Sequence, residues 1–192
     1  ELQHLKYQLQ PHFVFNILNN IYSLIDTAPK TAQETLHKLS KLMRYMLYYA
    51  KKDSITLAEE IDFIEKYIRL MQLKHDEKVK IDYRFSELQD KSYSIAPLLF
   101  VPLVENAFKH GVSTQDVSDI FFEFYLSDNK LIFKSENSNH PKTSTDKSGS
   151  GIGLENLTKR LELIYPSKHT FHFGVLDGKF IAELQIKLEN YG

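Results

Sequence analysis

Residues 97–111 read Pro-Leu-Leu-Phe-Val-Pro-Leu-Val-Glu-Asn-Ala-Phe-Lys-His-Gly, and this stretch decides how the second half of the chain is interpreted. Its spacing predicts a helix that ends near Gly111, with one apolar face made of Leu103, Val104, Ala107 and Phe108. The polar face carries Glu105, Asn106, Lys109 and His110. Amide and carboxylate oxygens suit Mg²⁺, and lysine suits phosphate. The same pattern also fits an ordinary amphipathic helix with a glycine C-cap, so both interpretations stay open.

Alternating patterns on both sides of this helix predict a β-sheet. The predicted strands are residues 79–85, 119–126, 130–137, 169–176 and 179–188. The last two meet at Asp177-Gly178, a strong hairpin signal. Residues 138–148 contain no apolar residue and are expected to form a loop, and a further helix should run from Gly149–Gly153 to about Tyr165. Strands with helices packed on one face make a two-layer α/β domain.

The first part of the chain has a different composition. Residues 1–75 contain no glycine, and all seven glycines lie in 111–192. Apolar spacing in the first part predicts three helices. Two capping-box patterns, Thr31–Glu34 and Thr56–Glu59, are expected to open the second and third helices. We therefore divide the chain into a helical part, 1–75, and an α/β part, 76–192.

Composition excludes several classes of function. Lys and Arg number 24 against 25 Asp and Glu, so broad electrostatic binding to nucleic acid or to an anionic membrane is not expected. The chain has no cysteine, which excludes disulfides, thiolate zinc sites and cysteine nucleophiles. No apolar run approaches the ~20 residues needed to cross a bilayer. The chain begins with Glu1, already inside a helical pattern, and we interpret it as a fragment.

A proline and a histidine interrupt the first helical pattern, at Gln10-Pro11-His12. A proline in a helix interior costs ~3 kcal/mol, because it removes a hydrogen bond and clashes with the preceding turn. His12 and Asn16 are four residues apart and share one helix face. An imidazole with one unprotonated nitrogen facing solvent is a nucleophile, and a neighbouring amide can hold its ring or position a water. The alternative is a polar pair on a kinked structural helix.

Glycines cluster in Gly149-x-Gly151-x-Gly153-Leu154, just before a predicted helix. Glycines allow the backbone to approach phosphates closely, and a helix N-terminus offers free N–H groups. The spacing resembles the dinucleotide-binding fingerprint only superficially, because it is GxGxG and follows a polar loop. A flexible glycine hinge is the alternative.

The order of these motifs is more specific than any one of them. PHFVFN (11–16), PLVENAFKHG (102–111) and GSGIGLENLTKRLELIYP (149–166) resemble the cytoplasmic core of the LytS-like sensor histidine kinases. The resemblance covers essentially the whole chain. It implies an α+β fold: a helical hairpin that pairs into a dimeric four-helix bundle, followed by a Bergerat-type ATP-binding sandwich. Residues 1–75 would then be the dimerisation and phosphoacceptor region, and residues 76–192 the catalytic domain.

The same resemblance implies an activity and a role for each motif. The protein would autophosphorylate on His12 with ATP and pass the phosphoryl group to an aspartate of a response regulator, with Asn16 and Glu105 beside the reaction. Asn106 would hold Mg²⁺, and Lys109 and His110 would approach the phosphates. The lid and its supporting helix would contribute Gly149, Gly151, Gly153, Leu154, Asn156 and Arg160. The resemblance also implies a homodimer, in the cytoplasm, of a bacterial inner-membrane protein that meets the membrane only through segments absent here.

Two positions depart from histidine kinases at large. Phe13, not an acidic residue, follows His12, so the general base stays unassigned. The usual adenine-binding Asp is also missing, and alternation along 130–137 makes Asn137 the candidate. Its carbonyl can accept from an adenine amino group, without the charge that strengthens such a bond.

Two other functions compete with the kinase. One is a catalytically silent dimeric scaffold whose nucleotide site has degenerated at Asn137. The other is a chaperone- or gyrase-type ATPase of the same sandwich fold. The PHFVFN motif argues against the latter, because such ATPases need no exposed histidine on a kinked helix.

Overall fold

A computed structural model describes residues 11–73, 75, 77–86, 93–113, 115–140 and 152–188. Its helices are α2 (Pro11–Leu24), α3 (Pro29–Tyr49), α4 (Leu57–Gln72), α5 (Val101–Gly111) and α6 (Ile152–Ile164). The main sheet contains β2 (Val79–Phe85), β4 (Ser118–Ser127), β5 (Lys130–Ser138), β6 (His169–Leu176) and β7 (Lys179–Lys187). Two short strands, β1 (Ile55–Thr56) and β3 (Ser94–Ile95), pair separately. None of the described helices is both long and apolar enough to cross a bilayer.

The five predicted strands form one mixed sheet in the order β2-β4-β5-β7-β6. β2 runs parallel to β4, and the remaining neighbours are antiparallel. The two hairpins turn at residues with positive φ: Asp128 and Asn129 (49° and 59°), and Asp177 and Gly178 (50° and 76°). Asn, Asp and Gly tolerate this left-handed conformation, which matches the twist of the adjoining strands. The predicted strands and the Asp177-Gly178 turn are therefore confirmed.

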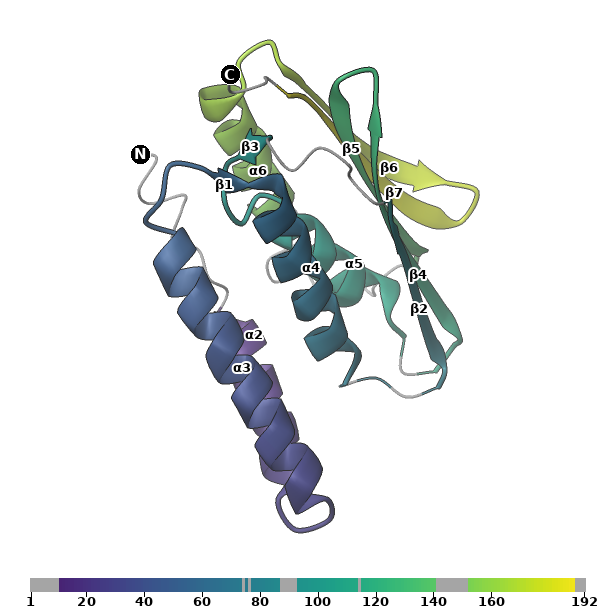
Figure 1. The fold of residues 1–192 in the computed structure, drawn as a ribbon. Helices are drawn as coiled ribbons and strands as arrows, with labels where there is room; N and C mark the ends of the chain where they lie inside the picture. The colour runs from purple at the N-terminus through teal and green to yellow at the C-terminus, as the bar shows by residue number, and fades with distance from the viewer. Residues whose placement is uncertain are drawn as a thin grey trace.

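Helices α4, α5 and α6 cover one face of the sheet, as Figure 1 shows. The core between these layers contains the fully buried rings of Phe100, Phe122, Phe124 and Phe133. Phe100 approaches Phe124 edge-on with ring centroids 4.7 Å apart, and Phe124 lies 4.5 Å from Phe133. Aromatic pairs in this geometry add to the free energy of burial. The predicted two-layer α/β architecture is confirmed.

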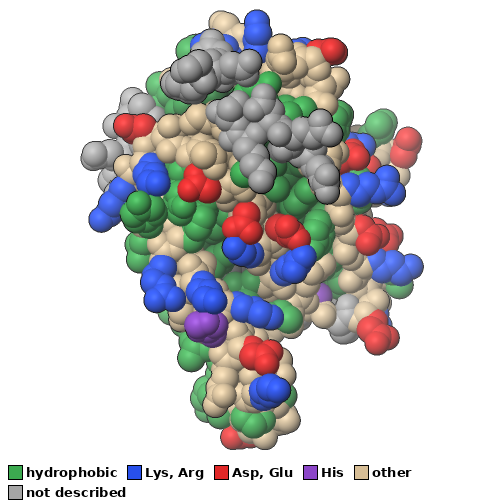
Figure 2. Space-filling model, viewed as in Figure 1, with side chains coloured by type: hydrophobic (Ala, Val, Ile, Leu, Met, Phe, Trp, Pro, Cys, Tyr) green, Lys and Arg blue, Asp and Glu red, His purple; other side chains and the backbone are tan. Residues whose placement is uncertain are grey.

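The α2–α3 hairpin lies on the side of α4 that faces away from the sheet (Figure 1). Tyr45 of α3 stacks on Phe63 of α4, and its hydroxyl donates to the carbonyl of Glu59 at 2.6 Å. The Tyr49 hydroxyl donates to the Glu59 carboxylate at 2.7 Å, while Asn20 of α2 donates to the Leu73 carbonyl. Figure 2 shows hydrophobic side chains at the surface among interspersed positive and negative ones, including on the projecting end of the hairpin.

One of the two predicted capping boxes is confirmed and the other is wrong. Thr56 caps α4: its hydroxyl accepts from the Glu59 N–H, and the Glu59 carboxylate accepts from the Thr56 N–H at 2.8 Å. α3 instead begins two residues before Thr31, at Pro29, and has no side-chain cap. Proline suits the first turn of a helix because the N–H that it lacks would have had no partner there. The expected cap at Thr31 was outcompeted by this proline.

The two threonines provide a matched test of this correction. We expect Thr56→Ala to lower the free energy of unfolding by about 1 kcal/mol, the usual cost of losing an N-cap. Thr31→Ala should change it by less than about 0.5 kcal/mol, because Thr31 is exposed within the helix and alanine favours helix. Urea unfolding of both variants measures the difference. Equal losses would contradict the assignment of the helix starts.

Candidate functional site

The four polar residues predicted on one helix lie on the last part of α5, toward its C-terminus. Glu105, Asn106 and His110 are partly buried, and Lys109 is exposed. α5 packs against α4, α6 and the sheet, so it is not a free surface helix. This packing fixes the backbone that carries the four polar residues.

Glu105 makes a contact that the sequence did not indicate. The fully buried Tyr67 of α4 donates its hydroxyl to Glu105 Oε1 at 2.9 Å. Burial raises the pKa of Glu105 to about 7, while the hydrogen bond from Tyr67 and the charge of Lys109 oppose the rise. Such a carboxyl changes charge near neutral pH, which is a property of general acids and bases. Its side chain is turned toward α4.

Asn137, the candidate adenine-binding residue, lies near the end of β5 and is 1% exposed. Its Nδ2 donates to the Ser138 carbonyl at 2.8 Å, whereas its Oδ1 is buried with no partner among the described residues. A buried acceptor without a donor is costly, and such atoms are rare in native proteins. The Asn137 carbonyl therefore lacks a donor among the described residues.

Gly111 brings the end of α5 against Asn137. A Cβ at position 111 would lie 2.6 Å from Asn137 Cβ and 2.9 Å from its Nδ2. Glycine at this position therefore allows the C-terminus of α5 to approach β5 more closely than any other residue would. Lys109 and His110 directly precede Gly111 in the chain, so this contact brings them close to Asn137.

The glycine-rich motif is only partly described. Gly149 and Gly151 lie outside the described residues, and α6 begins directly afterwards at Ile152, as expected. Gly153 has open space where a Cβ would be, Leu154 is buried and Asn156 is partly buried. The phosphate-binding role of this motif stays a prediction.

Arg160 takes part in a separate buried cluster. It is 6% exposed, and its guanidinium donates to the carbonyls of Leu98 and Pro97 at 3.2 and 2.5 Å. On the opposite side, the fully buried Glu60 of α4 accepts from the backbone N–H of Leu98, Leu99 and Phe100 at 2.9, 2.9 and 3.5 Å. Burial raises the pKa of Glu60 to about 7 against these N–H groups and the charge of Arg160. Sequence reasoning missed Glu60, because a glutamate in a helical pattern suggests a solvated position.

His12 and Asn16 lie in α2, on the hairpin, and are therefore on a different part of the molecule from Asn106 and Asn137. Asn16 is partly buried. Pro11 is the first described residue of α2, so the expected kink before it falls outside the described residues. The structure brings the α5 residues and Asn137 together but does not bring His12 to them.

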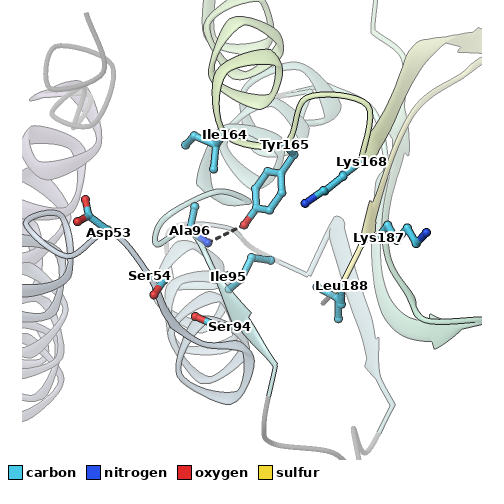
Figure 3. Close-up of a pocket in the computed structure, with 10 residues that line it drawn as sticks. All are labelled: Asp53, Ser54, Ser94, Ile95, Ala96, Ile164, Tyr165, Lys168, Lys187 and Leu188. Atoms are coloured by element: carbon cyan, nitrogen blue, oxygen red, sulfur yellow. Dashed lines mark hydrogen bonds between the residues drawn. The ribbon is translucent and has the colours of Figure 1, made fainter. Parts of the chain in front are cut away.

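The structure also contains a cavity of about 190 Å³ at the other end of the sheet. It is lined by Asp53, Ser54, Ser94, Ile95, Ala96, Ile164, Tyr165, Lys168, Lys187 and Leu188. In Figure 3 the Tyr165 hydroxyl accepts from the Ala96 N–H, and the Lys187 ammonium points away from the cavity. Lys187 pairs with Lys130, whereas Asn137 pairs with Phe180, seven residues further along β5. That separation is roughly 24 Å, so this cavity is not the site around Asn137.

The described residues contain no group of three or more His, Asp or Glu arranged to hold a metal ion. The family resemblance places Mg²⁺ on a single protein ligand, Asn106. Nucleotide phosphates commonly supply the remaining ligands to Mg²⁺.

Solved structures of histidine kinases have a similar fold. The histidine kinase domain of the Erythrobacter litoralis EL346 blue-light activated histidine kinase matches with a TM-score of 0.52 and 12% identity, covering 97% of this chain and 93% of that chain. The Acinetobacter baumannii histidine kinase AdeS matches with a TM-score of 0.51 and 13% identity, covering 96% of this chain and 88% of that chain. At these identities the likeness shows the fold, which is that of a histidine kinase.

Sequence comparison agrees with the fold. The family model described as Histidine kinase matches residues 1–79. The Sensor protein kinase HptS of Staphylococcus aureus strain USA300 is 34% identical over 131 residues, which is 68% of this chain and 25% of that protein. The same relative in strain MRSA252 gives the same values. The chain belongs to the histidine kinase family, and its match spans about a quarter of the length of these relatives.

Replacing Gly111 should disrupt the contact with Asn137. We expect Gly111→Ala to lower the free energy of unfolding by about 1–3 kcal/mol, because the new methyl group overlaps the base of a buried side chain. The matched control is Gly174→Ala, where a Cβ meets nothing within 4 Å and stability should be unchanged or slightly higher. Thermal unfolding of the two variants measures both effects. A neutral Gly111→Ala would contradict the close approach of α5 to β5.

The raised pKa of Glu105 predicts a pH dependence of stability. An acid whose pKa is higher folded than unfolded holds its proton more tightly in the fold, so stability falls as pH rises from about 4.5 to about 7. Relative to Glu105→Gln, the native chain should lose stability across this window by roughly 1 kcal/mol per pH unit at most. Above pH 8 the difference should be constant. Chemical unfolding at a series of pH values measures it, and a difference that does not vary between pH 5 and 7 would contradict the shift.

Proposed function

We propose that the chain is an ATP-dependent protein histidine kinase that autophosphorylates on His12. The observation that carries the proposal is the buried, unpartnered Oδ1 of Asn137 next to Gly111, at the end of the helix that bears Asn106, Lys109 and His110. The adenine amino group of ATP is a donor of the kind that this acceptor lacks. The match to the Histidine kinase family over residues 1–79, which include His12, supports the phosphoacceptor.

Most of the predicted site residues have a place in this proposal. Asn106 holds Mg²⁺, which neutralises phosphate charge, while the side chains of Lys109 and His110 provide positive charge and hydrogen bonds to the phosphates. The glycines at 149, 151 and 153 allow close approach of the backbone, with Leu154 and Asn156 on the supporting helix. In the transfer, a nitrogen–phosphorus bond forms at the His12 imidazole, and the bond between the γ-phosphate and ADP breaks. Asn16, one turn after His12, orients the imidazole.

His12 and the nucleotide site must come together for this transfer, since they lie on different parts of the molecule. In-line attack requires the γ-phosphorus within ~3–3.5 Å of the imidazole nitrogen. We propose that the α/β layers move relative to the hairpin, or that the nucleotide site of one subunit reaches His12 of the other. The domain boundary between residues 75 and 76 stays a prediction.

A homodimer through the hairpin is part of the proposal. Large apolar side chains on α2 and α3 face solvent: Phe15 is 63% exposed and Tyr22 78%, and Leu36, Leu47 and Tyr48 are also exposed. Apolar side chains in such a density on two antiparallel helices are typical of a helical bundle that is completed by a second copy. Pairing two hairpins gives a four-helix bundle with His12 on each half.

The second partner that we propose is the receiver domain of a response regulator, whose aspartate takes the phosphoryl group from His12. The relatives named as sensor protein kinases are between two and three times as long as this chain, because the 131 matched residues make up 25% of their length. We propose accordingly that the chain is the cytoplasmic part of a larger bacterial membrane sensor. Nucleic acid is not a proposed partner.

Incubation with labelled ATP and Mg²⁺ tests the proposal. The native chain should acquire acid-labile, base-stable phosphate, which is typical of a phosphohistidine. His12→Gln removes the nucleophile and should accept none while still binding ATP, and Asn106→Ala should lower labelling at least tenfold by weakening the hold on Mg²⁺. His37→Gln, at an exposed histidine of α3, is the matched control and should label normally.

Two outcomes would contradict the kinase. Label on another residue in His12→Gln would remove His12 as the acceptor. A native chain that is folded and dimeric yet neither binds ATP nor becomes labelled would favour the silent scaffold over the enzyme.

A further inference from the structure

The strongest unassigned feature is the loop 97–100, which two buried charged side chains hold from opposite sides. Glu60 of α4 accepts hydrogen bonds from its N–H groups, and Arg160 of α6 donates to its carbonyls. Glu60 is fully buried and Arg160 is 6% exposed. Burying two charges is costly unless both are hydrogen-bonded, so these residues do more than fill space.

The loop is held in an unusual conformation. Leu98 has a φ of 57°, in the left-handed region that few residues other than Gly, Asn and Asp adopt. Its N–H faces Glu60 Oε2 at 2.9 Å and its carbonyl faces the Arg160 guanidinium at 3.2 Å. Residues held in sparsely populated conformations persist only where the surroundings impose them. The two charged side chains impose this one.

The same loop determines where α5 begins. Phe100 is the N-cap of α5 and supplies no side-chain cap. The Glu60 carboxylate instead accepts from the Leu99 and Phe100 N–H groups, so a side chain of another helix satisfies donors at the start of α5. Its negative charge also lies at the positive end of the α5 dipole. α5 carries Glu105, Asn106, Lys109 and His110 toward its other end.

Arg160 connects this arrangement to the helix that follows the glycine motif. α6 carries Gly153, Leu154 and Asn156 in its first turns, and Arg160 in its third. Because one guanidinium binds the loop before α5, the spacing between α5 and α6 depends on the Pro97 and Leu98 carbonyls. These two helices carry the proposed phosphate-binding groups, while the proposed adenine contact lies on β5.

We propose that Glu60 and Arg160 are positioning residues: by holding the loop 97–100 between them, they set α5 against α6 so that both helices can bind the nucleotide phosphates. Neither side chain touches the nucleotide. This inference rests on the proposed function and reassigns Arg160 from direct contact with ATP to support of the residues that contact it.

The test compares the affinity for ATP, with Mg²⁺, with the affinity for adenosine, which has no phosphates. Isothermal titration of native protein gives the ratio of the two dissociation constants. In Glu60→Gln and Arg160→Lys, adenosine affinity should stay within about threefold of native, whereas ATP affinity should fall at least tenfold. The ratio of the ATP dissociation constant to the adenosine dissociation constant should therefore rise at least about threefold. A merely structural role would leave the ratio unchanged in any variant that is still folded at the assay temperature.

Glu59→Gln is the matched control, because Glu59 is the adjacent carboxylate of α4 and also makes hydrogen bonds, but to Thr56 and Tyr49. It should lower stability and leave the ratio at its native value. If Glu60→Gln does not fold, Arg160→Lys, which keeps the positive charge, decides the question.

The outcomes separate the two levels of the proposal. A native ratio in folded Glu60→Gln or Arg160→Lys overturns the positioning role and leaves the kinase intact. Absence of ATP binding by the native chain overturns the proposed function itself. Loss of adenosine affinity equal to the loss of ATP affinity in both variants also overturns positioning, because the effect would then extend to the Asn137 side of the site.

Discussion

The arrangement of three helices over the sheet depends on one carboxylate, that of Glu60. It lies in the helical layer with no exposure to solvent, and it accepts hydrogen bonds from three backbone N–H groups of the segment between β3 and α5. Apolar packing between helices is tolerant of small rotations and shifts, because many packings bury similar areas. A carboxylate that binds specific N–H groups does not tolerate such shifts, because a displaced carboxylate leaves its own charge and the N–H donors without partners. We infer that this interaction selects one arrangement of α4 and α5 among several of similar burial.

Tyrosine hydroxyls repeat this principle at other junctions of the helical layer. Tyr67 joins α4 to Glu105 of α5, and Tyr165 joins the end of α6 to the Ala96 N–H beside β3. The Tyr67 ring is fully buried and the Tyr165 ring is partly buried, and each hydroxyl makes a hydrogen bond to a neighbouring element. Rings of this kind bury much area and still fix direction, because their polar end has one acceptable position.

The parts of the fold that could be predicted from the sequence are those whose sequence signals lie in neighbouring residues. Alternation along residues 79–85 and the Asp177-Gly178 turn were readable because strand period and turn chemistry are properties of neighbouring residues, and the cap at Thr56 was readable for the same reason. The prediction that Thr31 caps α3 was wrong because Pro29, two residues earlier, is an equally local signal for a helix start. The sequence pattern alone does not show which of the two residues begins the helix. Strands β1 and β3 were missed because each has two residues, too few for a period to appear.

The candidate site also has parts that depend on local sequence signals and parts that do not. The polar residues of α5 and Asn137 were readable from helix and strand periodicity. Their mutual position was not, because it depends on Gly111 lying against Asn137, a contact between residues 26 positions apart in the chain. Glu60 was unreadable for a related reason. Its partners are backbone groups nearly forty residues away, and backbone groups carry no sequence signal of their own.

The double use of Glu59 has a consequence for how the hairpin and the α/β layers can separate. The Glu59 carboxylate caps the first turn of α4 and also accepts from the Tyr49 hydroxyl of α3, while its carbonyl accepts from Tyr45. Rotation of α3 about its own axis would move both hydroxyls by several ångströms, since side chains of this length lie far from the axis. The start of α4 would lose two donors at the same moment, although its cap at Thr56 would remain. Rotation of α3 would therefore affect α4 by removing hydrogen-bond donors from Glu59, and not through contacts between apolar surfaces.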